Sequence, residues 1–428
     1  MANRAIPPII HPIEAFPLPT PLRKRLRNGI PLFHFSNPNL DLVHLLVQVR
    51  TGSLYQPAKH VCNFAYTLLK ESSPTLSPQE TAEKLDYYGT AVNTVVGLTR
   101  VQIMISVPKN NIPNILPVIA EFLISPDYRA DNLRIMQDKE LKNLAYNTQK
   151  TDYLSWQLMW HEMLGGTFPT VSEIATPDTL NSLTTKQLKD FHRQSFCAEN
   201  VSVFVSGNLD NVSERLLSDL FSSVPSGVPS PELPQIPFCS NPDRVIFQHL
   251  DGCLQSSIIL CTLSTGYNHP DRTAFSVLNT LVGGYFSSRL MQNLRERQGL
   301  TYGITSASTY FGDQSIFAIN SDVNADQTER AIESCFEELQ RLENEPVSNE
   351  ELTMVKNYIA GIQLRAADTN VNAMQKYAFF HLFGLDETEM YRYLTDIKNV
   401  TPDNILILSK KYLSHNKFTK IIVGKYSS

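Results

Sequence analysis

The sequence predicts an α+β fold made of two homologous domains, each a mostly antiparallel sheet covered by helices on one face. The first observation behind this prediction is an internal repeat. A Thr-initiated amphipathic helix followed by an apolar strand ending in Gly occurs in Leu183–Asn208 and again in Val400–Lys425. The two segments start 217 residues apart. Threonine suits the first position of a helix, where its hydroxyl accepts a hydrogen bond from a backbone N–H.

The second observation is a further match at nearly the same distance. Leu42–Ser53 and Ser256–Gly266 are both β-rich runs that end in Thr-Gly, and they lie about 214 residues apart. Two matches at one offset favour duplication more strongly than either match alone. The chain is therefore expected to hold two similar domains of about 210 residues, within the usual size range of one domain.

The third observation is a proline-rich joint between the two copies. Ser222–Pro237 contains five prolines and little that could form a helix or a central strand. We therefore expect an N-terminal arm over residues 1–20, a first α+β domain over 21–221, a linker over 222–240 and a second α+β domain over 241–428.

Helical periodicity is clearest in the second copy. Within Asn324–Leu342 the apolar residues recur at three- and four-residue spacing, which predicts one buried helix face. Its members are Ala331, Ile332, Cys335, Phe336, Leu339 and Leu342. Such helices, interspersed with strands, favour a sheet with a helical layer over one side.

Composition excludes several functional classes. A net charge of −5, 42% apolar and 18% charged residues are typical of a globular protein and give no reason to expect nucleic acid. The basic run Leu22–Arg27 precedes Asn28-Gly29 and is expected to begin an exposed hairpin. The six cysteines lack paired C-x-x-C spacing. Neither a signal peptide nor a membrane-spanning run is recognised, so a cytoplasmic location is expected.

The stretch Ser287–Gly303 is the most informative part of the sequence for function. It places Arg295 and Tyr302 at the two ends of a corner, where a helix gives way through Gln298–Leu300 to an extended run. A guanidinium offers several N–H donors and a phenol offers one more, which suits holding a peptide carbonyl. The alternative is a structural role, with an exposed helix arginine and a packed strand tyrosine.

This stretch closely resembles the second-domain signature of the pitrilysin and insulinase (M16) family of zinc peptidases, and the resemblance extends from about Pro21 to Val423. It implies a pitrilysin-like duplication of a LuxS/metallohydrolase-like domain. In that family an Arg and a Tyr at this spacing bind substrate and help to stabilise the tetrahedral intermediate. The resemblance therefore implies catalytic roles for Arg295 and Tyr302.

The zinc motif that the family carries in its first domain is missing. Active members have His-x-x-Glu-His on the first helix and a further Glu on a later helix. Here Asn63 falls at the first His, Tyr66 at the Glu, Thr67 at the second His and Asn143 near the distal ligand. Amide and hydroxyl oxygens are weak neutral ligands for zinc. We therefore expect no metal and no cofactor on this chain, and no peptide hydrolysis by it alone.

A second resemblance concerns substrate binding. Leu85–Val107 is similar to the family's strand that pairs with an extended substrate, with Asn93 at the characteristic asparagine. An edge strand can bind a peptide through backbone hydrogen bonds, whatever its side chains. The alternative is an ordinary sheet strand.

The resemblance points to the zinc-free, non-catalytic subunit of a two-subunit peptidase. Leu278–Leu290 has only two glycines where the mitochondrial processing-peptidase partner has a long glycine-rich loop, so a bacterial two-subunit enzyme is the better match. Zinc and the catalytic water would belong to a partner subunit with an intact motif. A silent structural or assembly protein and a homodimeric peptide-binding protein are the alternatives.

Overall fold

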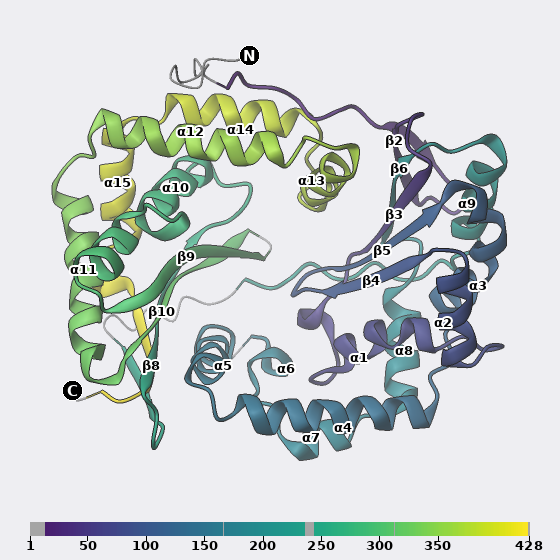
Figure 1. Ribbon diagram of the computed structural model, residues 1–428, viewed down its shortest axis with the longest axis horizontal. Helices are drawn as coiled ribbons and strands as arrows, with labels where there is room; N and C mark the ends of the chain where they lie inside the picture. The colour runs from purple at the N-terminus through teal and green to yellow at the C-terminus, as the bar shows by residue number, and fades with distance from the viewer. Residues whose placement is uncertain (1–12, 166, 236–243, 312, 427–428) are drawn as a thin grey trace, which may run out of the picture.

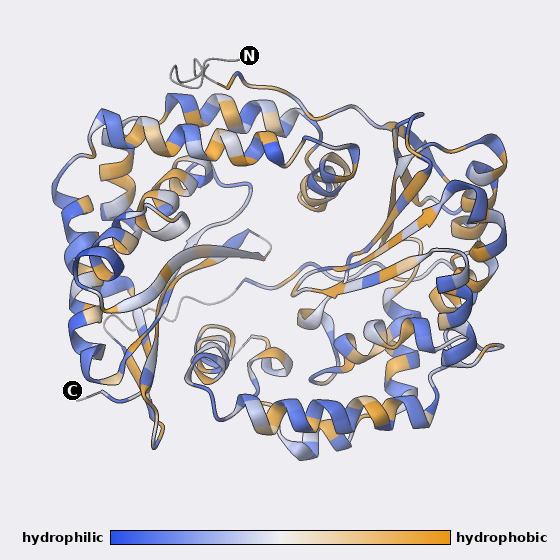
Figure 2. Ribbon diagram, viewed as in Figure 1, coloured by the Kyte–Doolittle hydropathy of each residue, from blue (hydrophilic) through white to orange (hydrophobic). Residues whose placement is uncertain are grey.

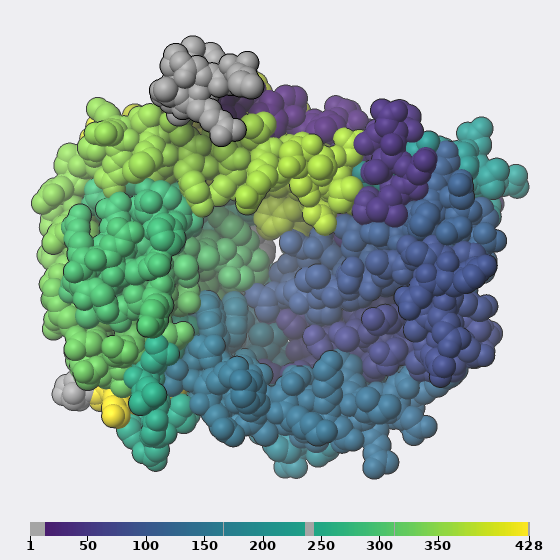
Figure 3. Space-filling view, viewed as in Figure 1, coloured from purple at the N-terminus to yellow at the C-terminus, as the bar shows by residue number. Residues whose placement is uncertain are grey.

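The computed structural model describes residues 13–165, 167–235, 244–311 and 313–426. Two β-sheets stand on either side of a central space, with helices around them (Figure 1). The space-filling view is hollowed between the two halves of the chain (Figure 3). The α+β class with two similar sheet-and-helix units, expected from the repeats, is confirmed.

The first sheet has the strand order β1-β2-β6-β3-β5-β4. Neighbouring strands are antiparallel except β2 and β6, which are parallel. The run Leu22–Arg27 does begin an exposed hairpin, because all four residues of β1 are exposed and Gly29 has a φ of +91° in the turn. The strands are β1 (Leu22–Arg25), β2 (Pro31–Ser36), β3 (Leu42–Val49), β4 (Ala91–Val96), β5 (Val101–Pro108) and β6 (Val201–Gly207).

The second sheet repeats this order without the first strand, as β7-β11-β8-β10-β9. Again one pair, β7 and β11, is parallel and the others are antiparallel. Apolar residues are dense on the inner strands, whereas the edge strand β9 is pale (Figure 2). The strands are β7 (Val245–His249), β8 (Gln255–Thr265), β9 (Thr301–Phe311), β10 (Gln314–Asn324) and β11 (Thr419–Gly424).

The two copies match in local detail where the sequence repeats. Thr184 and Thr401 each cap a helix with a reciprocal capping box. Gly207 and Gly424 close β6 and β11 with φ angles of +131° and +138°. A Cβ at Gly207 would lie 2.8 Å from the carbonyl oxygen of Leu42. Only glycine fits that backbone without strain, which explains why both copies end in glycine.

Helices cover the outer face of each sheet. The predicted apolar face of residues 324–342 is buried in the second half. The helices of the first half are α1 (Val61–Thr67), α2 (Pro78–Tyr87), α3 (Ile112–Ile124), α4 (Ala130–Asn147), α5 (Thr151–Leu164), α6 (Pro169–Ser172), α7 (Pro177–Asn181), α8 (Thr185–Ser195) and α9 (Asn211–Ser222). Those of the second half are α10 (Arg272–Asn279), η4 (Thr280–Gly284), η5 (Met291–Arg297), α11 (Thr328–Asn344), α12 (Asn349–Arg365), α13 (Asn370–Leu382), α14 (Thr388–Asn399) and α15 (Pro402–Tyr412). Single 3-10 turns occupy Ser53–Tyr55 (η1), Leu69–Glu71 (η2), Lys109–Asn111 (η3), Ala325–Gln327 (η6) and His415–Lys417 (η7).

The other face of each sheet is covered as well, by a helix from the opposite half. Helix α13 packs on β2, β6 and β3 of the first sheet, where Tyr377 and Phe380 meet Phe33 and Phe204 in one buried cluster. Helix α5 packs on β8 and β11 of the second sheet, with Met159 against its apolar residues. The two halves therefore exchange helices, a layer that the sequence analysis did not foresee.

The N-terminal arm also joins the two halves over the part that the structure describes, residues 13–20. Leu18 is buried, and its N–H donates to the carbonyl oxygen of Glu387 at 3.1 Å. Glu14 pairs with Lys398 of α14 at 2.9 Å. The arm leads from these second-half contacts directly into β1 of the first sheet.

The proline-rich segment contains no helix or strand over residues 223–235. Together with Phe168 and Phe191 of the first half, it walls a cavity of about 710 Å³. The remainder of the expected linker falls largely on residues 236–243, which lie outside the described part of the chain.

Replacing Phe204 should reveal how much the exchanged helix contributes to stability. Phe204 is fully buried between sheet and helix, with its ring centroid 5.1 Å from that of Phe33. We expect Phe204→Ala to lower the free energy of unfolding in urea by about 3–5 kcal/mol, because it leaves a cavity between two halves of the core. Val95→Ala, at an exposed position on β4, should change it by less than about 0.5 kcal/mol. A loss below about 1 kcal/mol for Phe204→Ala would contradict tight packing of α13 on the sheet.

Candidate functional site

The predicted corner is built from an unusual helix followed by an edge strand. Residues 291–297 form η5, a π-helical segment, and the N–H of Gln298 donates to the carbonyl oxygen of Asn293 five residues earlier at 3.0 Å. Gly299 then turns the chain with a φ of +66°, and β9 starts at Thr301. π-Helical turns are rare and are frequent at functional sites. The helix-to-strand corner expected from the sequence is therefore present.

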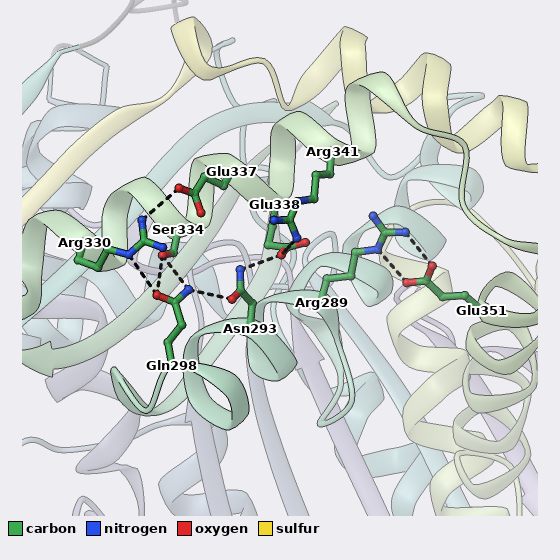
Figure 4. A network of polar contacts seen from close by, with 9 residues as sticks. All are labelled: Arg289, Asn293, Gln298, Arg330, Ser334, Glu337, Glu338, Arg341 and Glu351. Carbon is green, nitrogen blue, oxygen red and sulfur yellow. Dashed lines mark hydrogen bonds and ion pairs between the residues drawn. The ribbon is translucent and has the colours of Figure 1, made fainter.

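A buried polar network holds the inner side of this helix (Figure 4). Asn293 is 7% exposed, and its Nδ2 donates to Glu338 Oε1 of α11 at 2.7 Å. Gln298 Nε2 donates to Asn293 Oδ1 at 2.8 Å and to the Ser334 hydroxyl at 3.0 Å. Arg341 pairs with the same Glu338 oxygen at 2.8 Å. A buried network whose polar groups have hydrogen-bond partners holds the backbone in place. These contacts therefore fix the backbone position of the neighbouring Arg295.

Arg295 is half-buried on the same helix, but its side chain takes no part in this polar network. Its guanidinium carbon lies 4.7 Å from the ring centroid of Phe286. Among the residues that the structure describes, no hydrogen bond or ion pair to Arg295 is found. The donors of this guanidinium are thus available to a ligand.

Tyr302 is 90% exposed on β9, at a β-bulge. Tyr302 and Gly303 together face the single residue Asp322 of β10, because Thr301 pairs with Val323 and Ile304 with Ser321. The Thr301 hydroxyl donates to the carbonyl oxygen of Asp322 at 2.7 Å and so closes the bulge. A bulge of this kind changes the direction in which the neighbouring side chains point. Arg295 and Tyr302 do not contact each other here, and their roles stay a prediction.

Asn93 lies on the strand that the sequence analysis selected. It is exposed on β4, the edge strand of the first sheet, and pairs with Met104 of β5. Within the described residues, no strand covers the other side of β4 or of β9. Each half therefore presents an edge strand with a candidate residue on it.

The four positions at which the sequence analysis expected altered zinc ligands divide into exposed and buried residues. Asn63 and Thr67 are exposed one turn apart on α1, whereas Tyr66 is fully buried and its hydroxyl lies 2.7 Å from that of Ser195. Asn143 is exposed on α4, where its Nδ2 donates to Glu140 Oε2 at 3.1 Å. These donors do not fit zinc, because they are neutral and Tyr66 points into the core. Across the described ranges, no group of three or more His, Cys, Asp or Glu residues is placed to hold a metal ion.

Comparison with known proteins shows what part of the chain is similar to. Residues 182–359 match the family described as the peptidase M16 inactive domain. This segment is therefore similar to a peptidase M16 inactive domain. A protein named uncharacterized zinc protease from Rickettsia felis is 23% identical over 94% of this chain and 96% of its own length. One of the same name from Bacillus subtilis is 22% identical over 83% and 86%.

Two solved structures share the fold of this chain. The crystal structure of a peptidase M16 inactive domain from Pseudomonas fluorescens is similar with a TM-score of 0.86, at 20% identity over 95% of this chain and 99% of that one. That of a protease from Helicobacter pylori has a TM-score of 0.83, at 17% identity over 95% and 100%. The resemblance to the M16 family drawn from the sequence is confirmed. No helix in the described residues is long and apolar enough to cross a membrane.

Two features near the candidate residues carry no signal in the sequence. His60, at the start of α1, has a φ of +68°, and its Nε2 is buried with no hydrogen-bond partner among the described residues. Burial and the neighbouring Lys59 lower the pKa of His60, while Glu140 acts in the opposite direction. Phe286 was not singled out either, since a loop phenylalanine carries no motif. Only the fold brings its ring beneath Arg295.

The buried histidine next to Tyr66 of α1 should make the stability of the protein fall at acid pH. Complete burial lowers the pKa of His192, which stacks on Phe196 near Tyr66, to about 3. In the unfolded chain the same imidazole titrates near 6.5, so between these two pH values the unfolded state binds more protons. We expect stability to fall by up to about 1.4 kcal/mol per pH unit from this group as the pH drops below about 6.5.

Urea unfolding between pH 7 and pH 4 measures this loss. His192→Gln keeps a polar side chain but removes the titrating group, so its stability should decline less steeply than that of the wild type. Parallel pH profiles for the two proteins would contradict the assignment to His192.

Proposed function

We propose that this chain is the zinc-free subunit of a heteromeric M16-type metallopeptidase. A partner subunit would bring the intact His-x-x-Glu-His motif and the metal. This chain would supply Arg295 and Tyr302, which bind the peptide and stabilise the oxyanion formed at its carbonyl. One observation carries the proposal: Arg295, on a helix anchored by buried contacts, and Tyr302, on the following edge strand, have donors that no described residue occupies.

Such a division of work between two chains is physically reasonable. In a metallopeptidase the metal ion activates the attacking water, and the neutral donors Asn63 and Thr67 with the buried Tyr66 argue against metal binding here. Orientation of the carbonyl requires only fixed N–H and O–H donors. Those donors can come from another chain, provided that it does not move relative to the metal during the reaction.

Substrate would be held as an added strand. β4, which carries Asn93, and β9, which carries Tyr302, are edge strands of the two sheets. A peptide paired with either strand would be bound mainly through its backbone, so side-chain selectivity would be weak. The names of the curated relatives, zinc proteases, are compatible with peptides as the ligand class.

The proposal predicts that the corner matters only in the complex. Arg295→Ala and Tyr302→Phe should each lower turnover by about 100- to 1,000-fold, since removing one oxyanion donor typically costs that much. The measurement is cleavage of a quenched fluorescent peptide, with zinc, by this chain mixed with an M16 subunit that has an intact motif from the same genome. Arg297→Ala, at an exposed arginine on the same helix, is the matched control and should leave turnover unchanged.

The same assay distinguishes the alternatives. This chain alone should not cleave the peptide. Equal turnover for wild type, Arg295→Ala and Tyr302→Phe, with assembly verified by size-exclusion chromatography, would refute the role of the corner. A structural or assembly protein would give no activity with any M16 partner. A homodimeric peptide-binding protein would bind unfolded peptides saturably without cleavage.

A further inference from the structure

Phe286 stands out because a large apolar ring is left in solvent beside the candidate corner. It is 61% exposed and follows η4, in the short loop between the two π-helical segments. Tyr285 before it is held by a tilted ring contact with Tyr358 of α12, with ring centroids 4.9 Å apart. The backbone that presents Phe286 is thus anchored while its side chain projects outward.

Among hydrogen bonds, ion pairs and ring interactions within the described residues, the one found for the Arg295 side chain is with this ring, at 4.7 Å from the guanidinium carbon. A cation over an aromatic face is attracted to the ring's negative face. No hydrogen bond from this guanidinium is found among the described residues, so the contact with the ring leaves its N–H donors without a protein acceptor. The ring can therefore restrict the guanidinium and leave its hydrogen-bond donors available.

Arg289, one and a half turns earlier, shows the opposite arrangement (Figure 4). Its Nε and Nη2 donate to the two carboxylate oxygens of Glu351 at 2.8 and 2.7 Å. Such a bidentate pair fixes the arginine but occupies the donor edge that a carbonyl would need. Arg289 is therefore suited to joining the loop to α12, and Arg295 to binding a ligand.

We propose that Phe286 is a positioning residue for Arg295: its ring holds the guanidinium in place for the peptide carbonyl without occupying a donor. This inference rests on the proposed function of the corner. The polar network around Asn293 fixes the backbone of the helix, whereas a long arginine side chain keeps several rotatable bonds. Phe286 limits that remaining freedom.

A double-mutant cycle in the two-subunit cleavage assay tests the inference. Phe286→Ala should lower kcat/KM roughly two- to fivefold, as expected for an exposed cation–aromatic contact. Phe286→Tyr should retain activity because the aromatic face remains. Phe286→Leu should resemble Phe286→Ala because it keeps bulk but no such face. In an Arg295→Ala background, Phe286→Ala should have no further effect, since the ring acts through the arginine.

The possible outcomes distinguish the positioning role of Phe286 from the proposed function on which it rests. If Arg295→Ala lowers activity and Phe286→Ala does not, the positioning role is wrong and the proposed function stands. If Phe286→Ala lowers activity equally with and without Arg295, the ring contacts the peptide itself and positioning is again wrong. If Arg295→Ala equals the wild type, the proposed function fails first. Melting temperatures exclude unfolding, which is not expected at a position 61% exposed.

Discussion

The exchange of one helix between the two halves is the packing constraint on which the rest of the structure depends. α13 closes the first sheet and α5 closes the second, so neither sheet has its inner face covered by its own half alone. Phe33, Phe204 and Tyr377 form part of one buried aromatic cluster across this boundary. Burial of apolar surface is the main favourable contribution to folding, so the halves stabilise each other. The N-terminal arm adds a further connection through Leu18.

Because the two halves hold each other in place, the corner can present side chains to solvent while its backbone stays fixed. The interior of the corner is a satisfied network centred on Asn293 and Glu338, and its exterior is Arg295, Phe286 and Tyr302. The π-helical winding and the β-bulge both occur here, where a side chain is directed outward. Local irregularity is concentrated at the residues for which we propose a ligand, and the surrounding contacts are regular.

The candidate positions of the two halves lie in different surroundings. In the first half, Tyr66 of α1 is turned into the core, hydrogen-bonded to Ser195 and packed near His192. That arrangement favours stability over metal binding. In the second half the donors remain directed to solvent. The edge strands β4 and β9 are retained in both halves, and they are the feature that a peptide-binding role requires.

The sequence by itself determined the duplication, the class of fold and the location of the corner. Capping threonines, terminal glycines and apolar periodicity depend on short-range backbone geometry, so Thr184, Thr401, Gly207 and Gly424 could be interpreted without a structure. The sequence also predicted candidate roles for Asn63, Tyr66, Thr67, Asn93 and Asn143, but not which of these side chains are buried. Only the tertiary structure decided that α5 and α13 change sides, that Tyr66 points inward and that Phe286 lies beneath Arg295. Those contacts join residues whose meeting depends on how whole layers pack, and no local spacing in the chain encodes it.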